Sequence, residues 1–180
     1  MVYILLGTGF EEVEAITPVD LLRRAGVSVM TVGINGKTVY GGHGIGVEAD
    51  ITLGEMDLTD LEMIVLPGGL GGVASIRSSK EAMDAVRFAW DNNKFVAAIC
   101  AGPTVLADLG ITEKRNATCY PGCEAGMGNA NIQSDAASVL DGKLITGASA
   151  GCAVPFALTL VEAMCGKETA ESIRTQIVIR

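Results

Sequence analysis

The sequence predicts an α/β fold in which a doubly wound, mostly parallel sheet of the flavodoxin-like type is sandwiched by helices. Short, mostly apolar runs recur at 2–6, 27–32, 63–66 and 95–99, with helical spacing between several of them. Hydrophobic residues make up 49% of the chain but aromatic residues only 4%, which is typical of buried parallel strands built from small aliphatic side chains. Strand and helix alternate without a linker or a repeat, so we expect residues 1–180 to form a single domain.

The first strand is expected to end at Gly7, and the next helix to begin at Pro18. Proline suits the first turn of a helix and breaks its interior, so we expect Thr17 to be the cap and an acidic turn to precede it. Gly26 would end this helix. The glycine-rich stretch 33–47 is predicted as a hairpin excursion around Asn35-Gly36.

The second half of the chain continues the pattern. Helical spacing at 79–92 precedes the wholly apolar strand 95–99. Segments 138–140 and 143–146 flank Asp141-Gly142, a two-residue hairpin signal. Helices at about 153–164 and from Glu168 onward are expected to complete the domain.

Charge and composition exclude several classes of partner. The net charge of −8 argues against nucleic acid and anionic membranes, which are bound through clustered Lys and Arg. The chain has no apolar run of membrane-spanning length and no secretion signal at its start, so we expect a cytoplasmic protein with five reduced cysteines. A mean hydropathy of +0.39 is high for a monomer and favours a homodimer.

Cys100 is the strongest candidate for a reactive residue. It joins the apolar strand 95–99 to a helix that begins at Pro103, and small residues lie two positions before and after it. This is the pattern of a nucleophile elbow, whose strained central residue tolerates only small neighbours. The following helix start would favour the thiolate and lower the pKa of the thiol. The alternative is a buried structural cysteine at a strand end.

Two further segments are expected at the same edge of the sheet. Gly68 and Gly69 end the strand 63–66, and the N–H groups of Gly69 and Ala101 could stabilise an oxyanion, although an ordinary tight turn is the alternative. Glu11, Glu12 and Glu14 follow the first strand. Crowded carboxyl groups resist ionisation, so one of the three could stay protonated and exchange protons with the cysteine, but a solvated acidic turn remains possible.

These segments together resemble the ThiJ/PfpI superfamily, and within it the branch of the parkinsonism-associated protein deglycase. The motifs are ICAGP around Cys100, VLPGG around Gly68 and FEEVEAITPVDLLRRAG after the first strand, and the likeness extends over nearly the whole chain. The resemblance implies a flavodoxin-like sandwich, a homodimer, Cys100 as an oxidation-prone nucleophile and Glu14 as its protonated partner.

One position departs from the family pattern. Where members carry a histidine, this chain has Tyr120, and its only histidine, His43, lies far away in the sequence. A protease-type triad therefore lacks its general base, which puts peptidase or amidase activity in doubt. Some relatives in the branch also lack this histidine, so glyoxalase or deglycase chemistry stays open, with Gly68 and Tyr120 as binding positions.

Other signals are weaker. Gly7-Thr8-Gly9 begins like a dinucleotide fingerprint, but Glu12 would repel a pyrophosphate, so no cofactor is expected. Cys119 and Cys123 lack the companions of a zinc site, and no metal is expected. Cys152, at the start of an apolar helix, is a rival nucleophile whose small neighbours better suit a subunit interface.

Two hypotheses of function follow. In the first, the chain is a cofactor-free glyoxalase or deglycase whose Cys100 attacks methylglyoxal or its adducts and whose Glu14 moves protons. In the second, Cys100 is a non-catalytic peroxide sensor whose oxidation controls a chaperone or binding activity.

Overall fold

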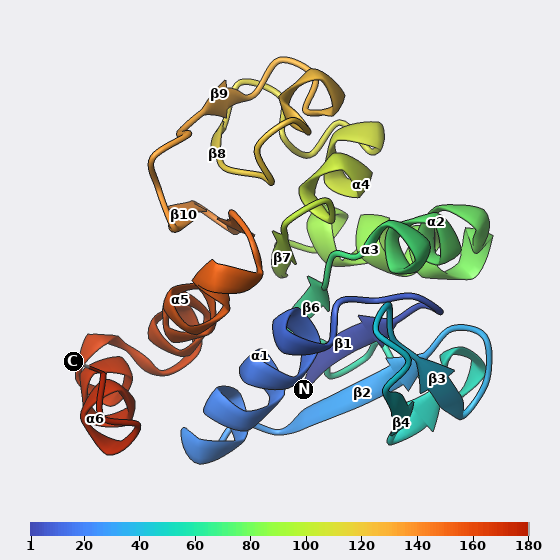
Figure 1. The fold of residues 1–180 in the computed structure, drawn as a ribbon, viewed down its shortest axis with the longest axis horizontal. Coiled ribbons are helices and arrows are strands. Elements are labelled where there is room, and N and C mark those ends of the chain that lie inside the picture. Colours follow the sequence, from blue (N-terminus) through green and yellow to red (C-terminus); the bar gives the residue numbers. More distant parts are fainter. Residues whose placement is uncertain (180) are drawn as a thin grey trace.

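A seven-stranded sheet forms the centre of the computed structural model, which describes residues 1–179 (Figure 1). The strand order is β10-β11-β7-β6-β1-β2-β5, and every neighbouring pair is parallel except β10 with β11. The order of the five central strands is that of a flavodoxin-like sheet, so the predicted fold class is confirmed. The strands are β1 (Val2–Leu6), β2 (Val29–Gly33), β5 (Ile51–Thr52), β6 (Met63–Leu66), β7 (Phe95–Ile99), β10 (Ser138–Asp141) and β11 (Leu144–Gly147).

Helices cover both faces of this sheet (Figure 1). One face carries α1 (Glu12–Arg24), α5 (Ala153–Cys165) and α6 (Lys167–Gln176), and the other carries α2 (Leu70–Ser78), α3 (Lys80–Asp91) and α4 (Pro103–Asp108). Two short pairs lie outside the main sheet: β3 (Thr38–Tyr40) with β4 (Gly46–Glu48), and β8 (Asn116–Ala117) with β9 (Asn131–Ile132). Three 3-10 turns complete the elements, at Leu53–Glu55, Glu124–Gly126 and Ala150–Cys152.

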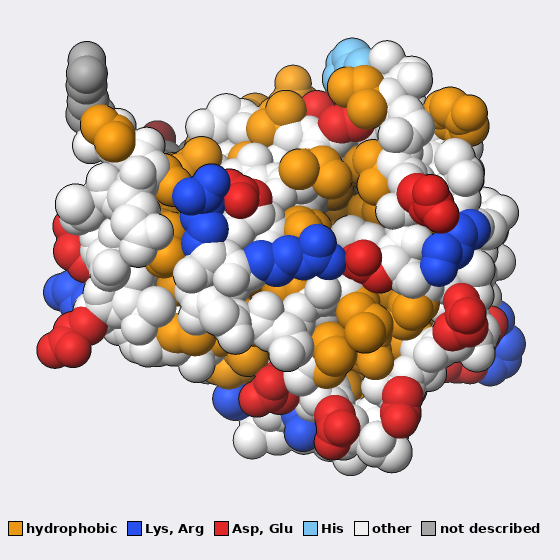
Figure 2. Space-filling model, turned by 90° about the horizontal axis from the view of Figure 1, so that it is seen from below, with side chains coloured by type: hydrophobic (Ala, Val, Ile, Leu, Met, Phe, Trp, Pro, Cys, Tyr) orange, Lys and Arg blue, Asp and Glu red, His pale blue; other side chains and the backbone are white. Residues whose placement is uncertain are grey.

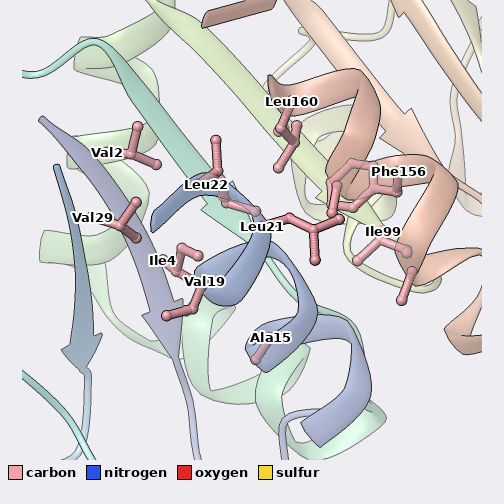
Figure 3. Close-up of a cluster of buried hydrophobic side chains, with 14 of the residues drawn as sticks. Val2, Ile4, Ala15, Val19, Leu21, Leu22, Val29, Ile99, Phe156 and Leu160 are labelled. Atoms are coloured by element: carbon pink, nitrogen blue, oxygen red, sulfur yellow. The ribbon is translucent and has the colours of Figure 1, made fainter. Parts of the chain in front are cut away.

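The strands are buried on both sides because successive side chains point to opposite faces. In β1, Val2 and Ile4 enter the cluster beneath α1 and α5, whereas Tyr3 and Leu5 enter the cluster beneath α2, α3 and α4. Figure 3 shows the first cluster, in which Phe156 of α5 packs close to Ile99 of β7 and to side chains of α1. This double burial explains why the strands appear in the sequence as continuous apolar runs.

Helix α1 begins at Glu12, so the predicted start at Pro18, with Thr17 as its cap, is wrong. Proline inside a helix removes the hydrogen bond to the carbonyl of the residue four positions earlier. Here the buried face of α1, which includes Ala15 and Val19, continues through Pro18 itself, and its packing against the sheet outweighs that loss. The acidic residues therefore lie in the first helical turn, where the sequence predicted a preceding loop.

The hairpin also differs from its prediction. β3 pairs with β4 through Val39 and Val47, and the turn lies at 41–45 rather than at Asn35-Gly36. The side chain of Asn35 instead accepts a hydrogen bond from the N–H of Thr8 over 3.2 Å. The asparagine thus holds the loop after β1, and the glycines further along the chain make the reversal.

The remaining elements lie close to their predicted positions. The strands 63–66 and 95–99 and the antiparallel pair β10 and β11 are confirmed. Ser79 caps α3, and its hydroxyl accepts a hydrogen bond from the N–H of Ala82 over 3.2 Å. Helix α2, which starts directly after Gly69, was not predicted, because its sequence contains two glycines that weaken the helical signal.

The surface mixes charged and apolar side chains. Figure 2, which views the molecule from below, shows Lys and Arg interspersed with acidic residues and several hydrophobic patches between them. Within the described residues, no helix combines the length and the apolar character needed to cross a membrane.

Candidate active site

Cys100 occupies a strained turn at the carboxyl end of β7. Its φ of +65° lies in the left-handed region, which costs energy for any residue with a Cβ. Two hydrogen bonds hold it there: its N–H donates to the carbonyl of Gly147 and its own carbonyl accepts from the N–H of Tyr120, both over 2.9 Å. A Cβ at Gly102 would approach the Leu66 carbonyl oxygen to 2.7 Å, so the small neighbour is a steric requirement, and the predicted elbow is confirmed.

Glu14 reaches this elbow from the first turn of α1. Its side chain is completely buried, Oε2 accepts a hydrogen bond of 2.8 Å from the N–H of Gly68, and Oε1 has no partner. A Cβ at Gly68 would lie 2.6 Å from Oε2 of Glu14 and 2.7 Å from Cβ of Cys100. The missing side chain of Gly68 is therefore what allows the carboxyl group and the cysteine to meet.

Burial perturbs the ionisation of both groups. It raises the pKa of Glu14 to about 7, although the hydrogen bonds from Cys100 and the Gly68 N–H partly oppose it. Burial and the adjacent charge of Glu14 raise the pKa of Cys100 to about 12. Above pH 7 the pair thus carries one negative charge, on the carboxylate, and the sulfur keeps its proton.

The prediction that Cys100 is a thiolate is therefore wrong for the resting site. The start of the helix after Cys100 was expected to favour the thiolate, but this helix, α4, has only six residues. The N–H groups of Ala101 and Gly69 do lower the pKa of the thiol, yet burial and Glu14 outweigh them. Sequence alone could not give this balance, because it depends on the depth at which the pair is buried.

The two backbone N–H groups predicted to stabilise an oxyanion lie beside the sulfur, and that role stays a prediction. The N–H groups of Ala101 and Gly69 are near enough to the sulfur of Cys100 to oppose the rise in the pKa of its thiol. Gly69 has φ +84°, and a Cβ there would clash with the carbonyl oxygen of Gly9, so only glycine fits. When a substrate carbon is bonded to the sulfur, two such N–H donors can stabilise a negative charge on the oxygen of that carbon.

Tyr120 lies beside the elbow through its backbone, and its side chain is about half exposed. The position thus borders the elbow, and a role of Tyr120 in binding stays a prediction. His43 is not brought to the sulfur by any hydrogen bond in the described residues. Its Nδ1 lies 2.9 Å from Oε2 of Glu12 and 3.6 Å from Oε2 of Glu11.

Glu12 has a structural role that the sequence did not reveal. Its buried carboxylate accepts hydrogen bonds from the N–H of His43 over 2.8 Å and of Ile45 over 3.4 Å, and the imidazole of His43 occupies the other oxygen. Burial works against this charge, but the hydrogen bonds outweigh it and lower the pKa of Glu12 to about 2. Glu12 therefore ties the hairpin turn to α1, a contact between segments whose proximity only the fold reveals.

Within residues 1–179, only the side chains of Glu11, Glu12 and His43 form a group whose ligand atoms could hold a metal ion. Donor atoms of Glu11, Glu12 and His43 lie within 4.8 Å of one another. The Glu12 carboxylate already accepts hydrogen bonds at both oxygens, so the hairpin contacts explain the cluster without an ion.

Cys152, the rival nucleophile, is partly exposed at the start of α5, where its sulfur accepts a hydrogen bond of 3.7 Å from the hydroxyl of Ser149. It has no buried carboxyl partner like that of Cys100. The geometry therefore favours Cys100 as the reactive residue.

The chain is similar to several known proteins. The family model described as the DJ-1/PfpI family matches residues 1–163. Protein dj-1beta of Drosophila melanogaster is 34% identical over 98% of this chain and 95% of its own length, and its crystal structure superposes with a TM-score of 0.95 over 99% of this chain and 97% of that one.

Two other relatives are informative. A deglycase of Pyrococcus horikoshii is 33% identical over 81% of this chain and 87% of its own length. A structure described as oxidised Toxoplasma gondii DJ-1 is 28% identical, covers 98% of this chain and 97% of that one, and has a TM-score of 0.93. The match of the family model over most of the chain and the dj-1beta identity along nearly its whole length show that this chain belongs to the DJ-1/PfpI family.

Proposed function

We propose that this protein is a cofactor-free, cysteine-dependent glyoxalase or deglycase that acts on methylglyoxal or its adducts. The observation that carries the proposal is that the Glu14 carboxyl group and Cys100 both border the space that a side chain at Gly68 would fill. A carboxyl group whose pKa is about 7 can both accept and return a proton at neutral pH. The relative from P. horikoshii, a deglycase by name, supports the same assignment.

The first step follows from the protonation state of the site. The Cys100 sulfur adds to the aldehyde carbon while the Glu14 carboxylate removes the thiol proton, so no free thiolate needs to form beforehand. A C–S bond forms as the C=O π bond opens, and Glu14 passes the proton taken from the thiol to the former aldehyde oxygen. This gives the hydroxyl of a hemithioacetal and restores the Glu14 carboxylate. The N–H groups of Gly69 and Ala101 stabilise that oxygen while it is negative.

The second step moves hydrogen between adjacent carbons. Glu14 removes the proton from the carbon bonded to sulfur, giving an enediol, and returns a proton to the neighbouring carbon, giving a thioester. Water then cleaves the C–S bond, releases a 2-hydroxy acid and restores the thiol of Cys100. The net reaction consumes one water molecule and needs no oxidant, which is consistent with a site built from one thiol, one carboxyl group and backbone donors.

The experiment is a methylglyoxal assay with purified variants. Cys100→Ser and Glu14→Gln should each lose nearly all turnover and production of 2-hydroxy acid. Cys165→Ser is the matched control, because Cys165 is exposed at the far end of α5 and should leave turnover unchanged. Wild-type turnover in Cys100→Ser would refute the mechanism.

A second candidate is a peroxide sensor, in which Cys100 is oxidised through sulfenic to sulfinic acid and controls a chaperone or binding activity. The oxidised state of the Toxoplasma gondii relative favours it. The protonated Glu14 carboxyl could donate a hydrogen bond to the sulfinate. Intact-mass measurement after mild peroxide separates the candidates: stable oxygen addition at Cys100 without aldehyde turnover supports the sensor. Peptidase or amidase activity is not proposed, since Glu12 engages the only histidine.

We also propose a homodimer formed through α1. Val13 and Ile16 project from this helix with 50% and 42% of their surface exposed, and a groove of about 780 Å³ lies between α1, Val154 and 176–179. A second copy would bury these apolar side chains. Light scattering should show a dimer for the wild type and a monomer for Ile16→Glu, and a monomeric wild type would overturn this proposal.

The cell compartment that we propose is the cytoplasm. All five cysteines are free, as in proteins of reducing compartments. Fluorescence microscopy of a tagged chain, compared with markers of the cell envelope, tests it.

A further inference from the structure

Two cysteines flank a tight turn that lies next to the Cys100 elbow. The N–H of Cys123 donates to the carbonyl of Tyr120 over 2.8 Å, and Gly122 between them has φ +101°. Proline at the second position of the turn and a glycine with positive φ at the third are typical of a type II turn. Cys119 directly precedes this turn and Cys123 closes it, so the chain reverses direction between the two cysteines.

The two thiols share one environment but differ in accessibility. Both pack into the apolar cluster on the α4 side of the sheet, together with Met127. Cys119 is 5% exposed, whereas Cys123 is partly exposed. Burial, the charge of Glu124 and the neighbouring Cys123 raise the pKa of Cys119 to about 11. An external reagent therefore meets Cys123 before it meets Cys119.

The turn is connected to the elbow by hydrogen bonds. The N–H of Tyr120, inside the turn, donates to the carbonyl of Cys100 over 2.9 Å. Directly before Cys119, the N–H of Thr118 donates to the hydroxyl of Thr146 over 2.9 Å. A change in the shape of the turn would thus act on one of the two hydrogen bonds that hold the strained backbone of Cys100.

We propose that Cys119 and Cys123 form a reversible disulfide that modulates the reactivity of Cys100. A bridge holds the two Cα atoms within roughly 7 Å of one another, so closing it restrains the turn around Tyr120. This thiol pair is a modification site separate from the Cys100–Glu14 pair, and neither candidate function above uses it.

The chemistry balances with a small-molecule disulfide, such as oxidised glutathione, as the oxidant. The sulfur of Cys123 attacks this disulfide, loses its proton and releases one glutathione thiol, leaving a mixed disulfide. The sulfur of Cys119 then attacks Cys123, loses its proton and releases the second glutathione. The protein loses two hydrogens and two electrons, and the oxidant is reduced to two thiols.

Peptide mass spectrometry tests the proposal directly. Trypsin releases the peptide 116–143, whose two cysteines are Cys119 and Cys123, and the peptide 95–114, which carries Cys100. After treatment with oxidised glutathione and alkylation, the peptide 116–143 should be unalkylated and lighter by two hydrogens, and dithiothreitol should restore both alkylation sites. The peptide 144–167 is an internal control, because its two cysteines lie at opposite ends of α5, too far apart to bridge.

Variants separate the bridge from its effect on the elbow. In Cys123→Ser the peptide 116–143 should stay unbridged. Cys119→Ala should also stay unbridged, and it serves as the test if Cys123→Ser does not fold. Oxidation should slow alkylation of Cys100 in the wild type but not in Cys123→Ser. Full alkylation of both thiols after oxidation, or a bridge from either to Cys100, would overturn the proposal, and an unchanged Cys100 rate would overturn the coupling. None of these readouts uses an aldehyde, so they stand apart from the test of the proposed enzyme.

Discussion

The buried carboxyl group of Glu14 should make the protein less stable as the pH rises toward neutrality. In the unfolded chain this group loses its proton near pH 4.5, but in the folded chain only near pH 7. Between these values the folded state binds more protons than the unfolded state, so the free energy of unfolding falls with rising pH. A pKa difference of one unit corresponds to about 1.4 kcal/mol. The raised pKa of Glu14 therefore lowers the free energy of unfolding by about 3 kcal/mol between pH 4.5 and pH 7.

The substitution Glu14→Gln removes this cost and keeps an oxygen that can accept the hydrogen bond from Gly68. Below about pH 4.5 the neutral carboxyl and the amide should differ little in stability. Above pH 7 the variant should be more stable than the wild type by up to about 3 kcal/mol, although it loses turnover. Burial keeps Cys100 protonated across this window, so it contributes no pH dependence of its own.

Urea unfolding at several pH values between about 4.5 and 8 measures this difference directly. The control is Glu11→Gln, since Glu11 influences Glu14 only through its charge and should change the pH dependence much less. Parallel stability curves for the wild type and Glu14→Gln would show that Glu14 ionises normally in the folded protein. That result would remove the physical basis of the proposed proton transfer.

Three other substitutions test the packing and hydrogen bonds described above. Gly68→Ala should cost about 1–3 kcal/mol by overpacking and should slow alkylation of Cys100; unchanged alkylation would mean that the space over Gly68 is not needed. Glu12→Gln should cost about 1.5–3 kcal/mol, as for hydrogen bonds to a charged group, with faster hydrogen exchange confined to the hairpin; slow exchange there would contradict its role. Phe156→Ala, in the buried core, should cost about 3–5 kcal/mol in urea unfolding, and a loss below about 1 kcal/mol would contradict its full burial.

The sequence determined the layers of the fold and the elbow. Continuous apolar runs reveal strands buried on both faces, and small residues around Cys100 reveal a backbone that must turn sharply. Both signals are local, because they depend on residues within a few positions of one another. The start of α1 was missed for the opposite reason: the packing that allows Pro18 inside the helix comes from the sheet beneath it.

The tertiary structure decided what the site can do. Three glutamates stand together in the sequence, and only the fold shows that Glu14 is buried against the cysteine while Glu12 holds the hairpin. The protonation of Cys100 likewise depends on burial and on the distance to Glu14, and these outweigh the short helix that the sequence suggested would ionise it. Electrostatic energies depend on depth and separation in space, and a linear pattern of residues carries neither.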